Sequence, residues 1–258
     1  MSLVCPSCSN SVVVQGALWA PCQKCRAMVF APQAGPSVLV AHASQPVAAR
    51  IGVTLAEHGL SPLHAAHGDA ALRLLEGHCP QAAVLDVALG GLMSFELVDR
   101  IRKSASLSRM VVVLVASVFN RTAYKRRPTS LYGADDYVEQ HHVHDRLPGK
   151  LRTLLGLPEY AGVDTTEAGK VTAQDTRADL SGAARVQALA LNIVADIALY
   201  HHDDIASAAA GAVPAHLAVV LEEGRRLLAE MMATHAISGD PIAEAFLALL
   251  DDVRRVGR

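Results

Sequence analysis

The sequence feature that most constrains the fold is a regular alternation, between Ser37 and Gly156, of short apolar runs with longer amphipathic stretches. Five runs have the length of strands, and the apolar residues between them recur at helical spacing. The runs are SVLVAH, PLHAA, AAVLDV, MVVVLVAS and DDYV, and helices are expected over residues 46–58, 68–76, 95–103, 121–131 and 144–155. This alternation predicts a doubly wound α/β domain with a five-stranded parallel sheet, in which ligands bind at the carboxyl ends of the strands.

The segment before this domain contains two CxxC pairs, CPSC and CQKC, separated by thirteen residues. Two such pairs provide the four soft thiolate ligands that tetrahedral zinc prefers. A segment of about thirty residues cannot bury a core unaided, so the metal should supply most of its folding energy. We expect SVVVQGALW to form short strands with a turn near Gly16 that bring the pairs together. The pattern therefore predicts a structural zinc site, with a redox-active dithiol as the alternative; its ligands are Cys5, Cys8, Cys22 and Cys25.

Residues 3–30 resemble the small zinc ribbons that begin many bacterial signalling proteins. The shared pattern is CPxC, a β-hairpin, CxxC and a hydrophobic end, here MVF. The resemblance leaves open whether the ribbon binds nucleic acid, protein or nothing. Lys24 and Arg26 alone do not make a convincing DNA contact surface.

Three motifs in the α/β region resemble the receiver domain of bacterial response regulators, a flavodoxin-like fold: VLDVALGGLMSFELVDRIRK, VVVLVAS and GADDYV. The resemblance implies that Asp86 occupies the phospho-acceptor position. It likewise implies that Ser117 stands at the position that senses the phosphoryl group, and Tyr137 at the aromatic switch position.

The chain departs from the family at the charged positions. The first strand ends VLVAHAS, so His42 and Ala43 replace the acidic pair, and YVEQHH puts Gln140 where the family has a lysine and His141 where it has a proline. An aspartyl phosphate forms only if a dication neutralises the incoming oxygens, and an imidazole and a methyl group are poor magnesium ligands. We therefore predict a pseudo-receiver without a magnesium site. Phosphorylation through an unusual metal geometry, or another use of Asp86, stays open.

A cluster of basic residues is expected on the face where receivers meet their outputs. It comprises Arg121, Lys125, Arg126 and Arg127, with Arg146, Lys150 and Arg152 on the last helix. One interpretation is a docking surface for an acidic partner, such as the chain's own C-terminal segment, which has 6 basic and 10 acidic residues. An ordinary solvated helix face is the alternative.

The C-terminal segment predicts an all-α bundle, or half of a dimeric one. Val186, Leu189, Ile193, Ile197 and Tyr200 form one apolar stripe; Pro214 opens a second helix and Asp240 caps a third. YHHDD and EQHHVHD contain metal-ligating residue types without ligand spacing, which favours polar helix-end chemistry. The predicted domains are a zinc ribbon (1–35), a receiver-like domain (36–156), a linker (157–181) and a helical interaction module (182–258).

Composition limits the function. The net charge of −2 argues against wholesale nucleic-acid coating, and Cys5, Pro6 and Cys8 interrupt any signal peptide. No run approaches the roughly 18 apolar residues of a membrane span, so we expect a cytoplasmic protein. No nucleophile with a paired base, phosphate-cradling loop or open metal site is present, which predicts a non-enzyme. We expect a bacterial signalling protein that acts by protein–protein interaction; a phosphorylatable regulator and a nucleic-acid-binding regulator acting through the ribbon are the alternatives.

Overall fold

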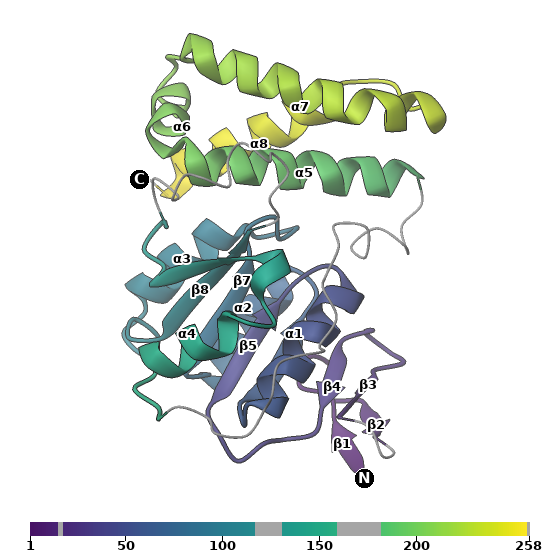
Figure 1. The fold of residues 1–258 in the computed structure, drawn as a ribbon, viewed down its shortest axis with the longest axis vertical. Helices are drawn as coiled ribbons and strands as arrows, with labels where there is room; N and C mark the ends of the chain where they lie inside the picture. Colours follow the sequence, from purple (N-terminus) through teal and green to yellow (C-terminus); the bar gives the residue numbers. More distant parts are fainter. Residues whose placement is uncertain (15–17, 117–130, 159–181, 257–258) are drawn as a thin grey trace. The chain divides into compact units, whose positions relative to one another are not determined.

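The structure is a computed structural model that describes residues 1–14, 18–116, 131–158 and 182–256. The chain divides into two compact units, and each is described by itself (Figure 1). The first holds the described parts of residues 1–116 and 132–176, so the ribbon and the sheet share one unit. The second holds the C-terminal helices. The predicted boundaries near residues 35, 156 and 181 stay predictions.

The five predicted strands form one parallel sheet in the first unit. They are β5 (Ser37–Ala41), β6 (Ser61–Ala65), β7 (Ala82–Asp86), β8 (Val111–Ala116) and β9 (Asp136–Glu139), in the order β6-β5-β7-β8-β9. Every neighbouring pair is parallel. Counted along the chain, this is the order 2-1-3-4-5 of flavodoxin-like folds, which confirms the predicted fold class.

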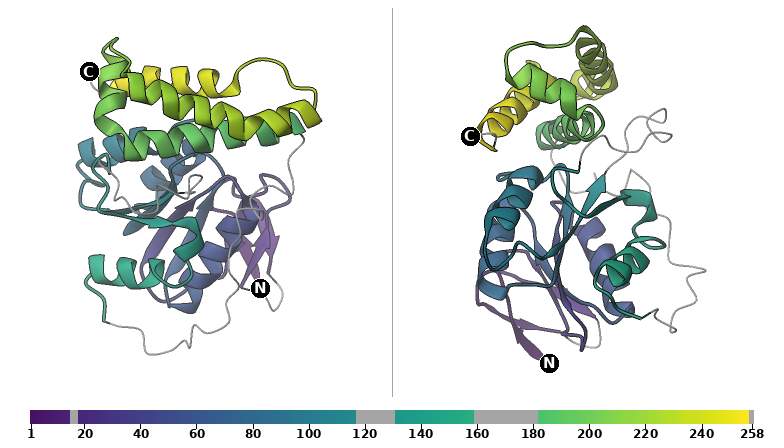
Figure 2. Two further views of the ribbon diagram at one scale, coloured as in Figure 1. Left: turned by 45° about the horizontal axis from the view of Figure 1, so that its top comes forward. Right: turned by 90° about the vertical axis from the view of Figure 1, so that its left-hand side faces the viewer.

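Helices cover both faces of this sheet: α1 (Gln45–Glu57), α2 (Gly68–His78), α3 (Ser94–Lys103) and α4 (Leu147–Leu154). Buried residues of α1 and α4 share one core with β5, β7, β8 and β9. The helices α2 and α3 lie over the opposite face (Figure 2). The last helix begins at Leu147 and not at residue 144 as expected, since residues 143–146 form a turn after the short 3-10 helix η2 (Gln140–His142). The helix expected over residues 121–131 falls almost wholly outside the described residues.

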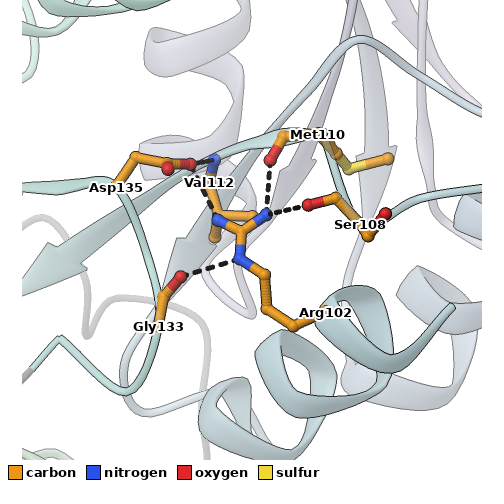
Figure 3. Close-up of polar contacts among 6 residues, drawn as sticks. All are labelled: Arg102, Ser108, Met110, Val112, Gly133 and Asp135. Atoms are coloured by element: carbon orange, nitrogen blue, oxygen red, sulfur yellow. Dashed lines mark hydrogen bonds and ion pairs between the residues drawn. The ribbon is translucent and has the colours of Figure 1, made fainter.

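One arginine ties the amino-terminal edge of the sheet together, as Figure 3 shows. The guanidinium of Arg102, from α3, donates to three main-chain carbonyls and pairs with Asp135 at 2.8 Å. The carbonyls belong to Ser108, Met110 and Gly133, at 3.0, 2.7 and 2.8 Å. Asp135 also accepts the amide of Val112 at 2.7 Å. The loops before β8 and β9 are therefore fixed to the end of α3.

The ribbon consists of two antiparallel hairpins. One pairs β1 (Ser2–Val4) with β2 (Ser11–Val13), and the other pairs β3 (Trp19–Pro21) with β4 (Met28–Phe30). Each hairpin therefore encloses one CxxC pair. We expected the hairpin to lie between the two CxxC pairs, and that expectation is wrong for the strands described, because β2 and β3 belong to different sheets.

The second unit contains four helices among its described residues: α5 (Gly182–Tyr200), α6 (His202–Ala209), α7 (Ala215–Thr234) and α8 (Pro241–Val256). The predicted stripe of α5 is buried at Val186, Leu189, Ile193 and Ile197. Asp240 caps α8 as expected, since its carboxylate accepts the amide of Ala243 at 3.0 Å. The helix α6 was not predicted. It begins because the backbone at His201 leaves the helical conformation, with φ −129° and ψ 44°.

One of the described helices, α5, is long and apolar enough to cross a membrane by length and composition. Half of its 18-residue window is buried inside the structure, and the mean hydropathy of that window is 1.3. Since α5 packs against α7 and α8, this burial is that of a core helix in a bundle. The helix is weak support for a membrane span.

Candidate functional site

The candidate site lies at the carboxyl edge of the sheet, where β5 and β7 end side by side. Asp86 is the last residue of β7, and the register pairs Ala41 with Leu85. His42, the next residue after Ala41, is thereby brought beside Asp86. Its Nε2 lies 3.5 Å from Oδ2 of the carboxylate. Both residues are buried, with 2% of His42 and 4% of Asp86 exposed.

The carboxyl group of Asp86 has protein neighbours on both oxygens. Its Oδ1 accepts the amide of Ala88 at 3.1 Å, while Oδ2 faces His42. The main-chain carbonyl of Asp86 accepts the hydroxyl of Ser94 at the start of α3. These contacts hold the strand end and the loop to α3 in a fixed conformation.

The imidazole of His42 is neutral and faces Asp86 with its protonated nitrogen. Its Nδ1 accepts the amide of Ser44 at 3.0 Å, so the ring proton resides on Nε2. Burial lowers the pKa of His42, and the nearby charge of Asp86 raises it only in part. Nε2 has no hydrogen-bond partner among the described residues, because 3.5 Å is too long for a good bond to Oδ2. The position therefore supplies a neutral donor where a dication would need carboxylates.

The other predicted positions are distributed along the same edge. Ala43 is exposed beside His42, Tyr137 lies half-buried in β9, and Gln140 is buried at the start of η2. Ser117 lies outside the described residues, directly after β8. The structure brings His42 and Asp86 into direct proximity.

The predicted basic surface is described only in part. Arg121, Lys125, Arg126 and Arg127 lie outside the described residues. On α4, Lys150 pairs with Asp136 at 2.5 Å and Arg152 donates to the carbonyl of His58 at 3.0 Å. These two cations therefore also hold α4 to the rest of its own unit.

A second buried histidine, which sequence reasoning missed, joins the ribbon to the site. His64 lies in β6 and is 1% exposed. Its Nδ1 accepts the amide of Met28 in β4 at 3.1 Å, and its Nε2 donates to the carbonyl of His42 at 3.2 Å. Burial lowers its pKa to about 4, so the ring is neutral. The only sequence signal was a polar residue in an otherwise apolar strand.

The four predicted cysteines of the ribbon converge on one point. Cys5 and Cys25 have their sulfurs 3.5 Å apart, as do Cys8 and Cys22, and all four sulfurs lie within 4.8 Å of one another. A tetrahedral zinc ion with Zn–S bonds of about 2.3 Å places its sulfurs about 3.8 Å apart. The cluster could bind a metal such as zinc.

The backbone around each cysteine pair has the same shape. Ser9 and Arg26 follow the pairs with φ of 60° and 59°, and their amides return to the carbonyls of Cys5 and Cys22, both at 2.9 Å. The amide of Cys25 lowers the pKa of Cys22 to about 6, whereas burial raises the pKa of Cys5 to about 12. Four thiolates in this partly buried cluster would repel one another, so a dication is the natural counter-charge.

Comparison with known proteins gives structural neighbours only. No protein-family model matches the chain, and no curated protein matches it. The receiver domain of a signal transduction histidine kinase from Syntrophus aciditrophicus is 22% identical, over 54% of this chain and 99% of that chain, with a TM-score of 0.42. The chemotaxis response regulator CheY4 of Vibrio cholerae is 18% identical, over 46% and 98%, with a TM-score of 0.41.

A third neighbour is the receiver domain of a sensor histidine kinase from Pseudomonas aeruginosa PAO1, whose active-site cleft coordinates a magnesium ion. It is 20% identical, over 48% of this chain and 99% of that chain, with a TM-score of 0.43. Two of these neighbours are receiver domains and one is a response regulator, and their similarity is too low to transfer chemistry. The sheet's own strand order and register define the fold class, which is flavodoxin-like.

Proposed function

We propose that this chain is a non-catalytic bacterial signalling protein whose receiver-like domain works by binding other proteins. The observation that supports this proposal is the buried pair of His42 and Asp86, whose facing atoms lie 3.5 Å apart. In this pair, the neutral imidazole of His42 lies beside the carboxylate of Asp86. Residues 42 and 43, where receivers have an acidic pair, supply no second carboxylate. We infer that the domain keeps the receiver architecture without the metal-assisted chemistry.

The carboxylate of Asp86 is buried, so added charge there is costly. Phosphorylation of Asp86 would place a dianionic group where the carboxylate is 4% exposed. Burying an ion without a compensating partner costs several kcal/mol or more. Magnesium ordinarily removes that cost, and it requires oxygen ligands, chiefly carboxylates. His42 offers a nitrogen that carries a proton, and Ala43 offers a methyl group.

The test is an intact-mass measurement on the full chain after incubation with acetyl phosphate or a phosphoramidate and magnesium. We expect no phosphoryl adduct above the level found in Asp86→Asn. A stoichiometric adduct that disappears in Asp86→Asn would contradict the proposal. That outcome would establish the second candidate function, a phosphorylatable response regulator, which is favoured by the location of Asp86 at the end of β7.

We propose that the ribbon serves the receiver-like domain as a structural part with bound zinc. Phe30 is buried in the sheet's core, and a Cβ on Gly52 of α1 would lie only 2.1 Å from its ring. The side chain of Gln45 donates to the carbonyl of Arg26 at 2.7 Å, and His64 accepts the amide of Met28. Reduced thiols of this kind suit the cytoplasm, where we infer that the protein acts.

A further inference from the structure

Three metal-ligating side chains converge at one corner of the helical unit. His201 lies between α5 and α6, Asp204 in the first turn of α6, and His216 in the first turn of α7. Nδ1 of His201 is 3.3 Å and Nε2 of His216 is 2.6 Å from the same oxygen, Oδ2 of Asp204. All three ligand atoms lie within 4.8 Å of one another.

We propose that His201, Asp204 and His216 bind a transition-metal dication, with zinc as the natural occupant. Two imidazole nitrogens and one carboxylate oxygen suit zinc, cobalt or nickel better than magnesium or calcium. Zinc bonds of about 2.0–2.1 Å place tetrahedral N and O ligands about 3.4 Å apart. The distance of 3.3 Å from His201 to Asp204 already matches that value, and the 2.6 Å from His216 to Asp204 would lengthen on metal binding.

The site has three protein ligands, which leaves one tetrahedral position for water or for a group from a partner. The corner is open to solvent, because 58% of the His216 side chain is exposed. A bound ion would fix the start of α7 to the corner between α5 and α6. The spacing of these residues in the sequence did not reveal the cluster. His216 belongs to a different helix from Asp204, and the chain leaves the helical conformation at His201.

Another cluster in the described residues has similar chemistry and serves as a control. Glu139, His141 and His142 also have ligand atoms within 4.8 Å of one another. These three residues come from one stretch of four, and Nδ1 of His142 already lies 3.1 Å from Asp145. The cluster at His201 is the better site because its ligands come from separate elements and both histidines approach the same oxygen, Oδ2 of Asp204.

The experiment uses the full chain loaded with zinc at the cysteines and titrated with cobalt(II). Equilibrium dialysis with metal analysis gives the stoichiometry, and visible absorption gives the ligand type. We expect one further equivalent of cobalt, with d–d absorption and without a thiolate-to-cobalt charge-transfer band. His216→Ala, at an exposed position, should weaken this binding by about 100-fold or more, since even outer-shell changes cost 10–100-fold. His142→Ala should leave it unchanged.

Asp204→Asn gives a second variant with nearly the same shape and no charge, and it should also weaken binding. Circular dichroism would confirm that each variant retains its helices. The proposal is overturned if the wild-type chain takes up no cobalt beyond its cysteines. It is also overturned if uptake is lost in His142→Ala and retained in His216→Ala, or if the absorption is that of thiolate ligands with release of zinc from the ribbon.

Discussion

The ribbon and the carboxyl edge of the sheet differ in how much negative charge each can focus on one point. In the ribbon, four cysteine sulfurs lie within 4.8 Å of one another, and each can become a thiolate. At the sheet edge, Asp86 faces the neutral ring of His42 at 3.5 Å. A dication is stabilised where several anionic ligands converge, so the four sulfurs could bind a metal such as zinc, and we propose that the edge beside Asp86 binds none.

The two places are also physically joined, since His64 connects the amide of Met28 in the ribbon to the carbonyl of His42. The difference teaches that a fold can gather anionic side chains at one point and leave a connected point of the same unit with a single carboxylate beside a neutral ring. Changes in each place should therefore have separate and predictable effects.

The largest effect should follow loss of the ribbon metal. In Cys25→Ser we expect the zinc bound at the ribbon to fall from one equivalent to nearly none. The ribbon strands should then lose their hydrogen-exchange protection, because structural zinc supplies about 10 kcal/mol or more of folding free energy in such modules. Cys79→Ser is the matched control, because Cys79 is exposed and far from the cluster in sequence. Full protection in Cys25→Ser would show that the ribbon folds without metal.

The next largest effect should follow the addition of carboxylates to the sheet edge, which would give that edge several anionic ligands as in the ribbon. His42→Asp combined with Ala43→Asp places two carboxylates beside Asp86. Without a cation we expect a loss of about 3 kcal/mol or more in stability, chiefly from the added carboxylate at buried position 42 beside Asp86. Magnesium should restore part of that loss and raise the melting temperature of the variant, leaving the wild type unaffected. Equal responses of the two proteins to magnesium in a thermal melt would contradict this reasoning.

A smaller effect should appear on acidification, through the connection between the two places. The pKa of His64 is about 4 in the folded chain and about 6.5 when unfolded, so the unfolded state binds more protons in that interval. The contribution of neutral His64 to the free energy of unfolding is complete above about pH 6.5 and is lost as the pH falls towards 4. We expect about 2 kcal/mol less stability at about pH 5 than at about pH 7 in urea unfolding, with zinc content measured at both. His64→Phe should reduce this dependence, with the lowered pKa of His42 supplying what remains, and an unchanged slope would refute the assignment.

The smallest effect should follow a change at the amino-terminal edge of the sheet, away from the ribbon and from Asp86. Arg102→Lys keeps the positive charge and loses the planar guanidinium, which donates to three main-chain carbonyls and pairs with Asp135. We expect a loss of roughly 1 kcal/mol in urea unfolding, since the side chain is partly exposed. The zinc content and the behaviour of Asp86 towards acetyl phosphate should stay as in the wild type. Altered zinc content would mean that the amino-terminal edge of the sheet and the ribbon are coupled.

The sequence predicted the parts of the molecule that local pattern determines. All five strands of the sheet, the helices α1, α2, α3, α5, α7 and α8, and the cysteine cluster follow from apolar periodicity and spacing. The register between β5 and β7 then follows from the fold and brings His42 to Asp86.

Contacts between distant segments were not predictable in this way. His64 meets Met28 across 36 positions, and Arg102 meets Asp135 across 33. Neither pair leaves a periodic trace, because a single polar residue does not reveal its partner. The helix break at His201 involves neither glycine nor proline, so α6 and the approach of His216 were missed as well.

The most direct test of the central claim is a search for a dication beside Asp86. Manganese(II), a paramagnetic substitute for magnesium, would be titrated into the isotope-labelled full chain while the amide signals of Val87 and Ala88 are followed by NMR. Because Asp86 faces a neutral imidazole, we expect no broadening of these signals beyond that seen in Asp86→Asn. Strong broadening at low manganese concentration that disappears in Asp86→Asn would show that the pocket holds a cation, and would contradict the account.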